Sequence, residues 1–221
     1  MRETNLRMMD LSHNKFKGRL PRSLAACKTL EYLDLESNQL IGGFPTWLGT
    51  LPELKLLSLR NNRFCGVITK PKQDCMFPKL RVLDISINNF TGNLPSEYIL
   101  IWNAMSGINS TELRYMNVYQ EFTLVEAKNI AFYSHYKYST TLVNKRVERY
   151  YEVIPENFAE IDFSYNKFNG EIPEFIGSLK ALRSLNLSFN NLVGCIPSSL
   201  GNLMELESLD LSHNNLSGVI P

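Results

Sequence analysis

The fold is decided by residues 182–197, LRSLNLSFNNLVGCIP, whose leucines, asparagine, glycine and proline return at the same offsets along the chain. Outward from this stretch, the pattern LxxLxLxxNxLxGxxP occurs seven times, the last copy being incomplete. Its starts are Leu6, Leu30, Leu54, Leu80, Phe158, Leu182 and Leu206. Neighbouring starts lie 24 or 26 residues apart, except across one long interruption. A fixed period of this length is typical of a solenoid, in which each repeat forms one coil.

Each repeat contains a short alternating segment that predicts a β-strand. In Leu33-Asp34-Leu35 the two leucines point to one face and the aspartate to the other. One such strand per repeat predicts a parallel sheet running along the solenoid. A single repeat buries too few apolar side chains to offset the entropy of ordering its backbone, so stability has to come from stacking on neighbours.

An asparagine follows each predicted strand at a constant offset. Its buried amide is expected to satisfy backbone groups of its own and neighbouring turns, because leaving such groups unpaired costs about 1–3 kcal/mol each. We therefore interpret this column as structural. Its members are Asn14, Asn38, Asn62, Asn88, Asn166, Asn190 and Asn214. The glycines and prolines that follow, such as Gly194 and Pro197, are expected to shape the return path of the chain.

The composition excludes several classes of partner. The 221 residues carry 23 Lys and Arg against 22 Asp and Glu, so no long-range field favours nucleic acid or an anionic membrane. No apolar run is long enough to span a bilayer, and the first residues do not resemble a secretory signal. With the last repeat incomplete, these observations predict a fragment of a longer protein.

The four cysteines show no metal-binding spacing, and no cofactor is expected. Cys65 and Cys75 lie in one short irregular stretch, where a disulfide between them would contribute about 3 kcal/mol by the loop-entropy model. Cys27 and Cys195 are interpreted as substitutes for small apolar residues.

The leucine pattern disappears between the fourth and fifth repeats, which predicts an inserted element. The expected organisation is therefore repeats 1–4 in residues 1–95, an island in residues 96–157, and repeats 5–7 in residues 158–221. The island holds eight of the ten tyrosines. Its Lys145, Arg146, Arg149, Tyr150 and Tyr151 form a candidate ligand-binding cluster, because such side chains are enriched at interface centres. The alternative is that the tyrosines only anchor the island to the repeats.

The residues between the strand leucines are expected to face the exposed, concave surface. We interpret this column as part of the consensus sequence of the repeat, not as a metal or acid–base site. Its members are Asp10, Asp34, Ser58, Asp84, Asp162, Asn186 and Asp210. The position before each ladder asparagine varies much more, which favours recognition over scaffold. Candidate ligand contacts are therefore Asn61, Ile87, Tyr165 and Phe189, together with Glu36 and Arg60 one position earlier. No catalytic motif is present, so no catalytic residue is predicted.

Four Asn-x-Ser/Thr sequences predict N-glycosylation in a secreted protein, at Asn89, Asn109, Asn186 and Asn215. A glycan at Asn186 would cover part of the surface near Phe189.

The LxGxIP element, present as residues 192–197 and 216–221, resembles that of plant extracellular leucine-rich-repeat receptors. The island followed by closing repeats is similar to the receptor-like proteins that lack a kinase domain. This resemblance implies an α/β-type leucine-rich-repeat horseshoe or superhelix, interrupted by an island, that recognises a peptide or protein ligand in defence or development.

The resemblance also implies signalling through leucine-rich-repeat co-receptor kinases at the extracellular face of the cell membrane, with membrane attachment through segments that are not in this chain. Two alternatives stay open. One is a secreted inhibitor of a microbial wall-degrading enzyme, although such inhibitors resemble short solenoids without an island. The other is a receptor fragment without activity.

Overall fold

The computed structural model describes residues 5–70, 76–107, 117–123, 131–137, 140–144, 147–151, 154, 155 and 157–221. The chain forms two compact units. The first contains residues 1–108 and 158–221, and the second contains residues 109–157. The repeats lie in the first unit.

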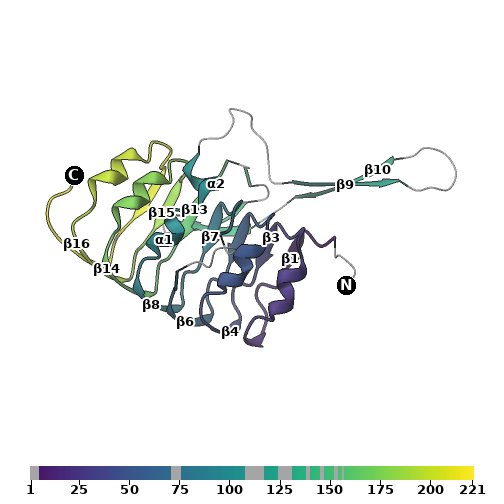
Figure 1. The fold of residues 1–221 in the computed structure, drawn as a ribbon, viewed down its shortest axis with the longest axis horizontal. Coiled ribbons are helices and arrows are strands. Elements are labelled where there is room, and N and C mark those ends of the chain that lie inside the picture. Colours follow the sequence, from purple (N-terminus) through teal and green to yellow (C-terminus); the bar gives the residue numbers. More distant parts are fainter. Residues whose placement is uncertain are drawn as a thin grey trace. The chain divides into compact units, whose positions relative to one another are not determined.

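A parallel sheet of seven strands runs along the first unit, one strand from each repeat (Figure 1). Its strands begin at the alternating segments, because leucines on one face pack into the core. In spatial order they are β1 (Met8–Asp10), β3 (Tyr32–Asp34), β5 (Leu56–Ser58), β7 (Val82–Asp84), β13 (Glu160–Asp162), β15 (Ser184–Asn186) and β17 (Ser208–Asp210). The predicted parallel-stranded solenoid is thus confirmed.

A second seven-stranded sheet, which the sequence analysis did not predict, lies on another side of each coil (Figure 1). Its strands follow the ladder asparagines, and all except the last contain the repeat glycine. They are β2 (Lys17–Gly18), β4 (Gln39–Gly42), β6 (Arg63–Val67), β8 (Asn89–Asn93), β14 (Lys167–Glu171), β16 (Asn191–Gly194) and β18 (Asn215–Leu216). Each coil therefore contributes two short strands, one to each sheet.

Short helical turns close the coils after the second sheet. Four are 3-10 helices: η1 (Arg22–Ala26), η2 (Thr46–Thr50), η3 (Glu174–Ser178) and η4 (Ser198–Asn202). In the fourth coil two α-helical turns take this place, α1 (Ser96–Ile99) and α2 (Asn103–Ser106). Trp102 and Met105 are fully buried there, and the Ala181 N–H donates to the Met105 carbonyl at 2.9 Å. Residues 96–107, which we had expected in the island, belong to the first unit.

The ladder asparagines tie consecutive coils together. The Asn166 Nδ2 donates to the carbonyl oxygens of Ile85, Phe163 and Ser164 at 3.0–3.2 Å. Its Oδ1 accepts from the Phe90 N–H at 3.0 Å. Asn38, Asn62, Asn88 and Asn190 make the same four contacts with their own neighbours.

The sheets continue directly across the interruption. Strand β13 pairs with β7, with Ile161 opposite Leu83 and Asp162 opposite Asp84. In the core, the rings of Phe90 and Phe168 stack with centroids 6.3 Å apart. The fourth and fifth coils are therefore neighbours, although the partners in the Asn166 hydrogen bonds between them lie 76 and 81 residues apart in the sequence.

The second unit contains two antiparallel pairs of strands. Strand β9 (Asn117–Thr123) pairs with β10 (Ala131–Lys137), and β11 (Thr140–Asn144) pairs with β12 (Val147–Tyr151).

Candidate ligand-binding surface

Arg60 joins three coils on the face of the first sheet that points away from the core. Its Nε donates to the Glu36 Oε1 at 3.2 Å, and its Nη1 donates to the Ser86 Oγ at 3.0 Å. The same Nη1 lies 3.9 Å from the Asp84 Oδ2. Glu36 and Arg60, predicted separately as ligand contacts, are thus partners of one another. Both side chains are largely buried, at 11% exposure each.

Burial dominates the electrostatics of this network. It raises the pKa of Glu36 to about 7, although the nearby Arg60 guanidinium acts in the opposite direction. Burial and the neighbouring Asp84 raise the pKa of Asp162 to about 7 as well. The pKa of Glu160, buried beside both carboxyl groups, is raised well above its usual range. Neutral carboxyl groups reduce the repulsion that stacked acids would otherwise create.

The aspartate column is less exposed than we expected. Asp34, Asp84 and Asp162 are buried, with exposures of 5%, 3% and 0%. The reason lies in local geometry: the Asp84 Oδ1 accepts from the N–H and the hydroxyl of Ser86, at 2.8 and 2.6 Å. Asp10, Asp34, Asp162 and Asp210 accept the corresponding N–H bond in their own coils. These carboxylates close the turn after each strand.

The residue before each ladder asparagine has a left-handed backbone, with φ between 50° and 55°, in every coil. Our argument that no scaffold requirement acts on this position was therefore wrong, because its backbone conformation is the same in all seven repeats. None of the seven is glycine, although glycine and asparagine tolerate this conformation best. They are His13, Ser37, Asn61, Ile87, Tyr165, Phe189 and His213.

Three of these residues form a continuous stack of rings on successive coils. Tyr165 and Phe189 lie with centroids 4.0 Å apart and planes 11° apart. Phe189 and His213 follow at 3.9 Å and 17°. Tyr165 is 49% exposed, His213 is exposed and Phe189 is half-buried. The structure therefore brings the two predicted aromatic contacts together and adds His213, which was not among the predicted contacts.

The other predicted contacts divide into two groups. Asn61 is exposed and donates to the Ser37 Oγ at 3.0 Å, and Ile87 is half-buried in the left-handed column. The island residues lie elsewhere: Lys145 and Arg146 are outside the described residues. Arg149, Tyr150 and Tyr151 belong to β12, but their side chains are not among those described.

The predicted modification sites differ in their surroundings. Asn89 and Asn215 are exposed at the starts of β8 and β18, whereas Asn109 is outside the described residues. The Asn186 Nδ2 donates to the Asp162 Oδ2 at 3.0 Å. Cys65 is exposed, and its predicted partner Cys75 lies outside the described residues, so this disulfide stays a prediction.

Two kinds of feature are absent from the described residues. No group of histidine, cysteine and acidic side chains in them is arranged to hold a metal ion. No helix in that part of the chain combines the length and the apolar character needed to cross a bilayer.

Two coil-forming strands, an asparagine ladder and a constant repeat length define a leucine-rich-repeat protein. Family models agree: "Leucine rich repeat" matches residues 156–219, and "Leucine Rich Repeat" matches residues 5–27, 29–51 and 79–98. Within this class, the chain belongs to the plant receptor-like proteins. It is 44% identical over 185 residues to Receptor-like protein 34 of Arabidopsis thaliana. The alignment covers 83% of this chain and 18% of the relative. The chain thus spans about a fifth of the length of such relatives.

Solved structures with the same fold include receptor ectodomains. The Arabidopsis receptor kinase HAESA, in complex with the peptide hormone IDA and the co-receptor SERK1, aligns with a TM-score of 0.67 and 30% identity over 97% of this chain and 27% of its own. The ectodomain of the receptor kinase GASSHO1/SCHENGEN3 from Arabidopsis thaliana, in complex with CASPARIAN STRIP INTEGRITY FACTOR 2, aligns with the same score and identity over 96% of this chain and 19% of its own.

Proposed function

We propose that this chain is part of the ligand-recognition ectodomain of a plant cell-surface receptor-like protein, acting in defence or development. The ligand is a peptide or protein, and the parent receptor signals through a leucine-rich-repeat co-receptor kinase. The complexes of HAESA and GASSHO1/SCHENGEN3 with their ligands support this function for the fold. We further propose that the chain lies on the extracellular side of the membrane and has no catalytic activity.

The observation that carries the proposal is the stack of Tyr165, Phe189 and His213. A bulky residue in a left-handed conformation costs roughly 1–2 kcal/mol, and an aromatic pair returns about 0.5–1.5 kcal/mol. The favourable contacts between the rings therefore offset, at most, the backbone strain at these positions. The rings also leave edges exposed at the margin of the first sheet. Amphipathic rings of this kind, held rigid before binding, supply contact area at low entropic cost.

Contacts on either side of the stack extend the proposed surface. Asn61 and Ile87 continue the left-handed column towards the first repeats. Glu36 and Arg60 neutralise each other, so we assign them to shaping the sheet face beside this column. The island cluster of Lys145, Arg146, Arg149, Tyr150 and Tyr151 remains part of the proposal on sequence grounds alone.

The test uses a random peptide library displayed on phage and panned against the purified chain. Retained peptides are then measured against the double variant Tyr165→Ser, Phe189→Ser. We expect at least about tenfold weaker binding, which corresponds to ~1.4 kcal/mol. The matched control is Phe175→Ser, because Phe175 is also an exposed aromatic residue, at 51%, but lies on η3.

Equal binding by the wild type and the double variant, with unchanged thermal unfolding, would refute the role of the stack. Loss of binding in both the double variant and the control would also contradict the proposal, since it would mean that any exposed ring serves equally. A second probe, the SERK1 ectodomain, tests the co-receptor part separately by its association in the presence of a retained peptide.

A further inference from the structure

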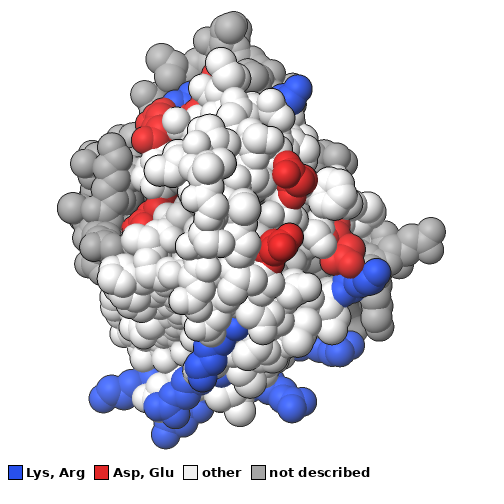
Figure 2. All heavy atoms as spheres, turned by 90° about the vertical axis from the view of Figure 1, so that its left-hand side faces the viewer, with Lys and Arg blue, Asp and Glu red and all other residues white. Residues whose placement is uncertain are grey.

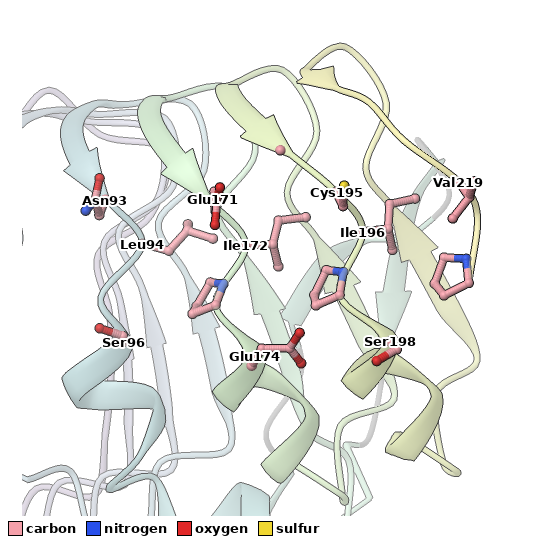
Figure 3. Close-up of a pocket in the computed structure, with 14 residues that line it drawn as sticks. Asn93, Leu94, Ser96, Glu171, Ile172, Glu174, Cys195, Ile196, Ser198 and Val219 are labelled. Atoms are coloured by element: carbon pink, nitrogen blue, oxygen red, sulfur yellow. The ribbon is translucent and has the colours of Figure 1, made fainter.

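A groove runs along the side of the fourth to seventh coils, between the end of the second sheet and the helical turns (Figure 3). Its volume is about 810 Å³, within the usual range of about 300–1,000 Å³ for ligand pockets. It lies on a different part of each coil from the aromatic stack, because the stack precedes the second sheet and the groove follows it. It is therefore independent of the proposed function.

One wall of the groove is built by side chains that lie over the glycine of the next coil. A Cβ atom on Gly170 would lie 2.5 Å from the Asn93 Oδ1, and one on Gly194 would lie 2.9 Å from the Glu171 Cγ. Both glycines have positive φ, at 73° and 81°. Because Gly194 has no side chain, the aliphatic part of the Glu171 side chain occupies the space above it. This contact sets the position of the Glu171 carboxylate.

The floor of the groove is apolar and the opposite wall is polar. Leu94 and Ile172 are buried below it, and Ile196 is half-buried beside them (Figure 3). Glu174 and Ser198 belong to the helical turns η3 and η4 on the other wall. An extended chain can place side chains alternately on the floor and towards the walls.

The groove carries uncompensated negative charge. Glu171 and Glu174 are exposed and come from opposite walls. Among the described residues neither makes an ion pair, whereas the nearby Glu205 and Glu207 both pair with Arg183. Figure 2 shows Lys and Arg gathered along the lower edge of this end of the molecule, apart from most of its acidic side chains. A bound partner could therefore supply the missing positive charge.

We propose that this groove docks an extended segment of a partner protein in which lysine or arginine alternates with apolar residues. Charge complementarity selects the basic side chains, and the floor of Leu94, Ile172 and Ile196 selects the apolar ones. Coils about 4.8 Å apart and an extended rise of about 3.3 Å per residue mean that the four coils of the groove accommodate about four residues.

The probes are short fluorescein-labelled peptides of alternating sequence: Lys with Val, Glu with Val, and Ser with Val. Binding to the full chain is followed by fluorescence anisotropy at low salt. We expect the Lys–Val peptide alone to bind, and the double variant Glu171→Gln, Glu174→Gln to bind it about fivefold or more weakly, since each exposed pair contributes modestly. The variant Ile196→Ser, which changes the floor and no charge, should also weaken binding.

The matched control is Glu53→Gln. This substitution removes an exposed carboxylate that pairs with Lys79 and is not part of the groove. Binding of the Lys–Val peptide should be unchanged in it. The proposal is overturned if the double variant binds as tightly as the wild type, if Glu53→Gln weakens binding equally, or if the Glu–Val and Ser–Val peptides bind as well as the Lys–Val peptide. Normal thermal unfolding of each variant shows that its coils are intact.

Discussion

At the scale of single residues, the ladder asparagines hold consecutive coils together, because a strand-end carbonyl such as that of Ile85 accepts from the asparagines of two coils, Asn88 and Asn166. Asn166 matters most, because its bonds to Ile85 and Phe90 join the coils on either side of the insertion. We expect Asn166→Ala to lower the free energy of unfolding by about 2–4 kcal/mol, since the buried Phe90 N–H loses its partner and three carbonyl oxygens each lose one of two donors. Urea denaturation followed by circular dichroism measures this.

The matched control for this substitution is Asn14→Ala in the first coil. Asn14 is exposed and its two bonds, to Leu11 and Ser12, stay within its own turn. We expect a loss below about 1 kcal/mol there. Similar losses at both positions would show that the ladder does not act between coils.

The buried carboxyl groups near Arg60 make stability depend on pH in an unusual direction. The folded-state pKa of Glu36, about 7, is above its ordinary value of 4.5, so the folded chain binds more protons than the unfolded chain between these values. Stability is therefore fully present below about pH 4.5 and is lost as the pH rises through 7. The raised pKa values of Asp34, Asp84, Glu160 and Asp162 act in the same direction.

This predicts a lower free energy of unfolding at about pH 8 than at about pH 5, by at most about 3 kcal/mol for Glu36 alone, and therefore a lower urea midpoint. Glu36→Gln should flatten part of the dependence, because glutamine does not titrate. A midpoint that rises between the two pH values in the wild type, or an identical profile in the variant, would contradict the prediction.

At the scale of elements, sequence predicted the first sheet well and the second sheet not at all. The alternation in Leu33-Asp34-Leu35 shows which side chains face the hydrophobic core, and this pattern alone places the first strand. Strands such as β16 contain a glycine and pair only with equivalent strands of neighbouring coils, so their hydrogen bonds have no local sequence signal.

The left-handed column was missed for a related reason. The sign of φ at Tyr165 is imposed by the hydrogen bonds around it, in which the Tyr165 N–H donates to the Ser188 carbonyl and the Tyr165 carbonyl accepts from Asn88. Its side chain gives no indication of this, since tyrosine rarely adopts such a conformation. By contrast, the pairing of Glu36 with Arg60 could have been predicted, because equivalent positions 24 residues apart lie side by side in a solenoid.

The glycine of the second sheet gives the prediction at this scale. Gly194→Ala adds a Cβ atom 2.9 Å from the Glu171 Cγ at a positive φ of 81°. We expect a loss of about 1–2 kcal/mol in unfolding free energy, from backbone strain and the displaced glutamate. Gly66→Ala separates the two causes, because a Cβ at Gly66, with φ of 88°, has nothing within 4 Å. Gly201→Ala, at an open position of η4 without positive φ, should cost nothing; an equal loss there would overturn this account.

At the scale of the whole molecule, the first unit should fold without the second. Strand β13 pairs with β7 directly, and α1 and α2 belong to the first unit. Replacing residues 109–157 by a glycine-serine linker should therefore preserve cooperative unfolding and most of the stability. A deletion that begins at Ser96 should be far more damaging, since it removes the buried side chains of Tyr98, Trp102 and Met105.

Differential scanning calorimetry of the two deletions checks this prediction. A single transition close to that of the intact chain is expected for the 109–157 replacement only. Aggregation or loss of the transition in both would mean that the solenoid depends on the second unit. The same replacement, tested with the retained peptides, shows whether the island contributes to recognition.

The direct pairing of β7 with β13 also bears on how this architecture tolerates change. The bond between Phe90 and Asn166 spans 76 residues, whereas equivalent bonds elsewhere span 22 or 24. Because closure entropy grows only with the logarithm of contour length, this roughly threefold extension costs about 1 kcal/mol. The segment inserted between the fourth and fifth coils can therefore change in length or in sequence during evolution with little loss of stability in the solenoid. New binding specificities can arise in this segment while the repeats stay unchanged.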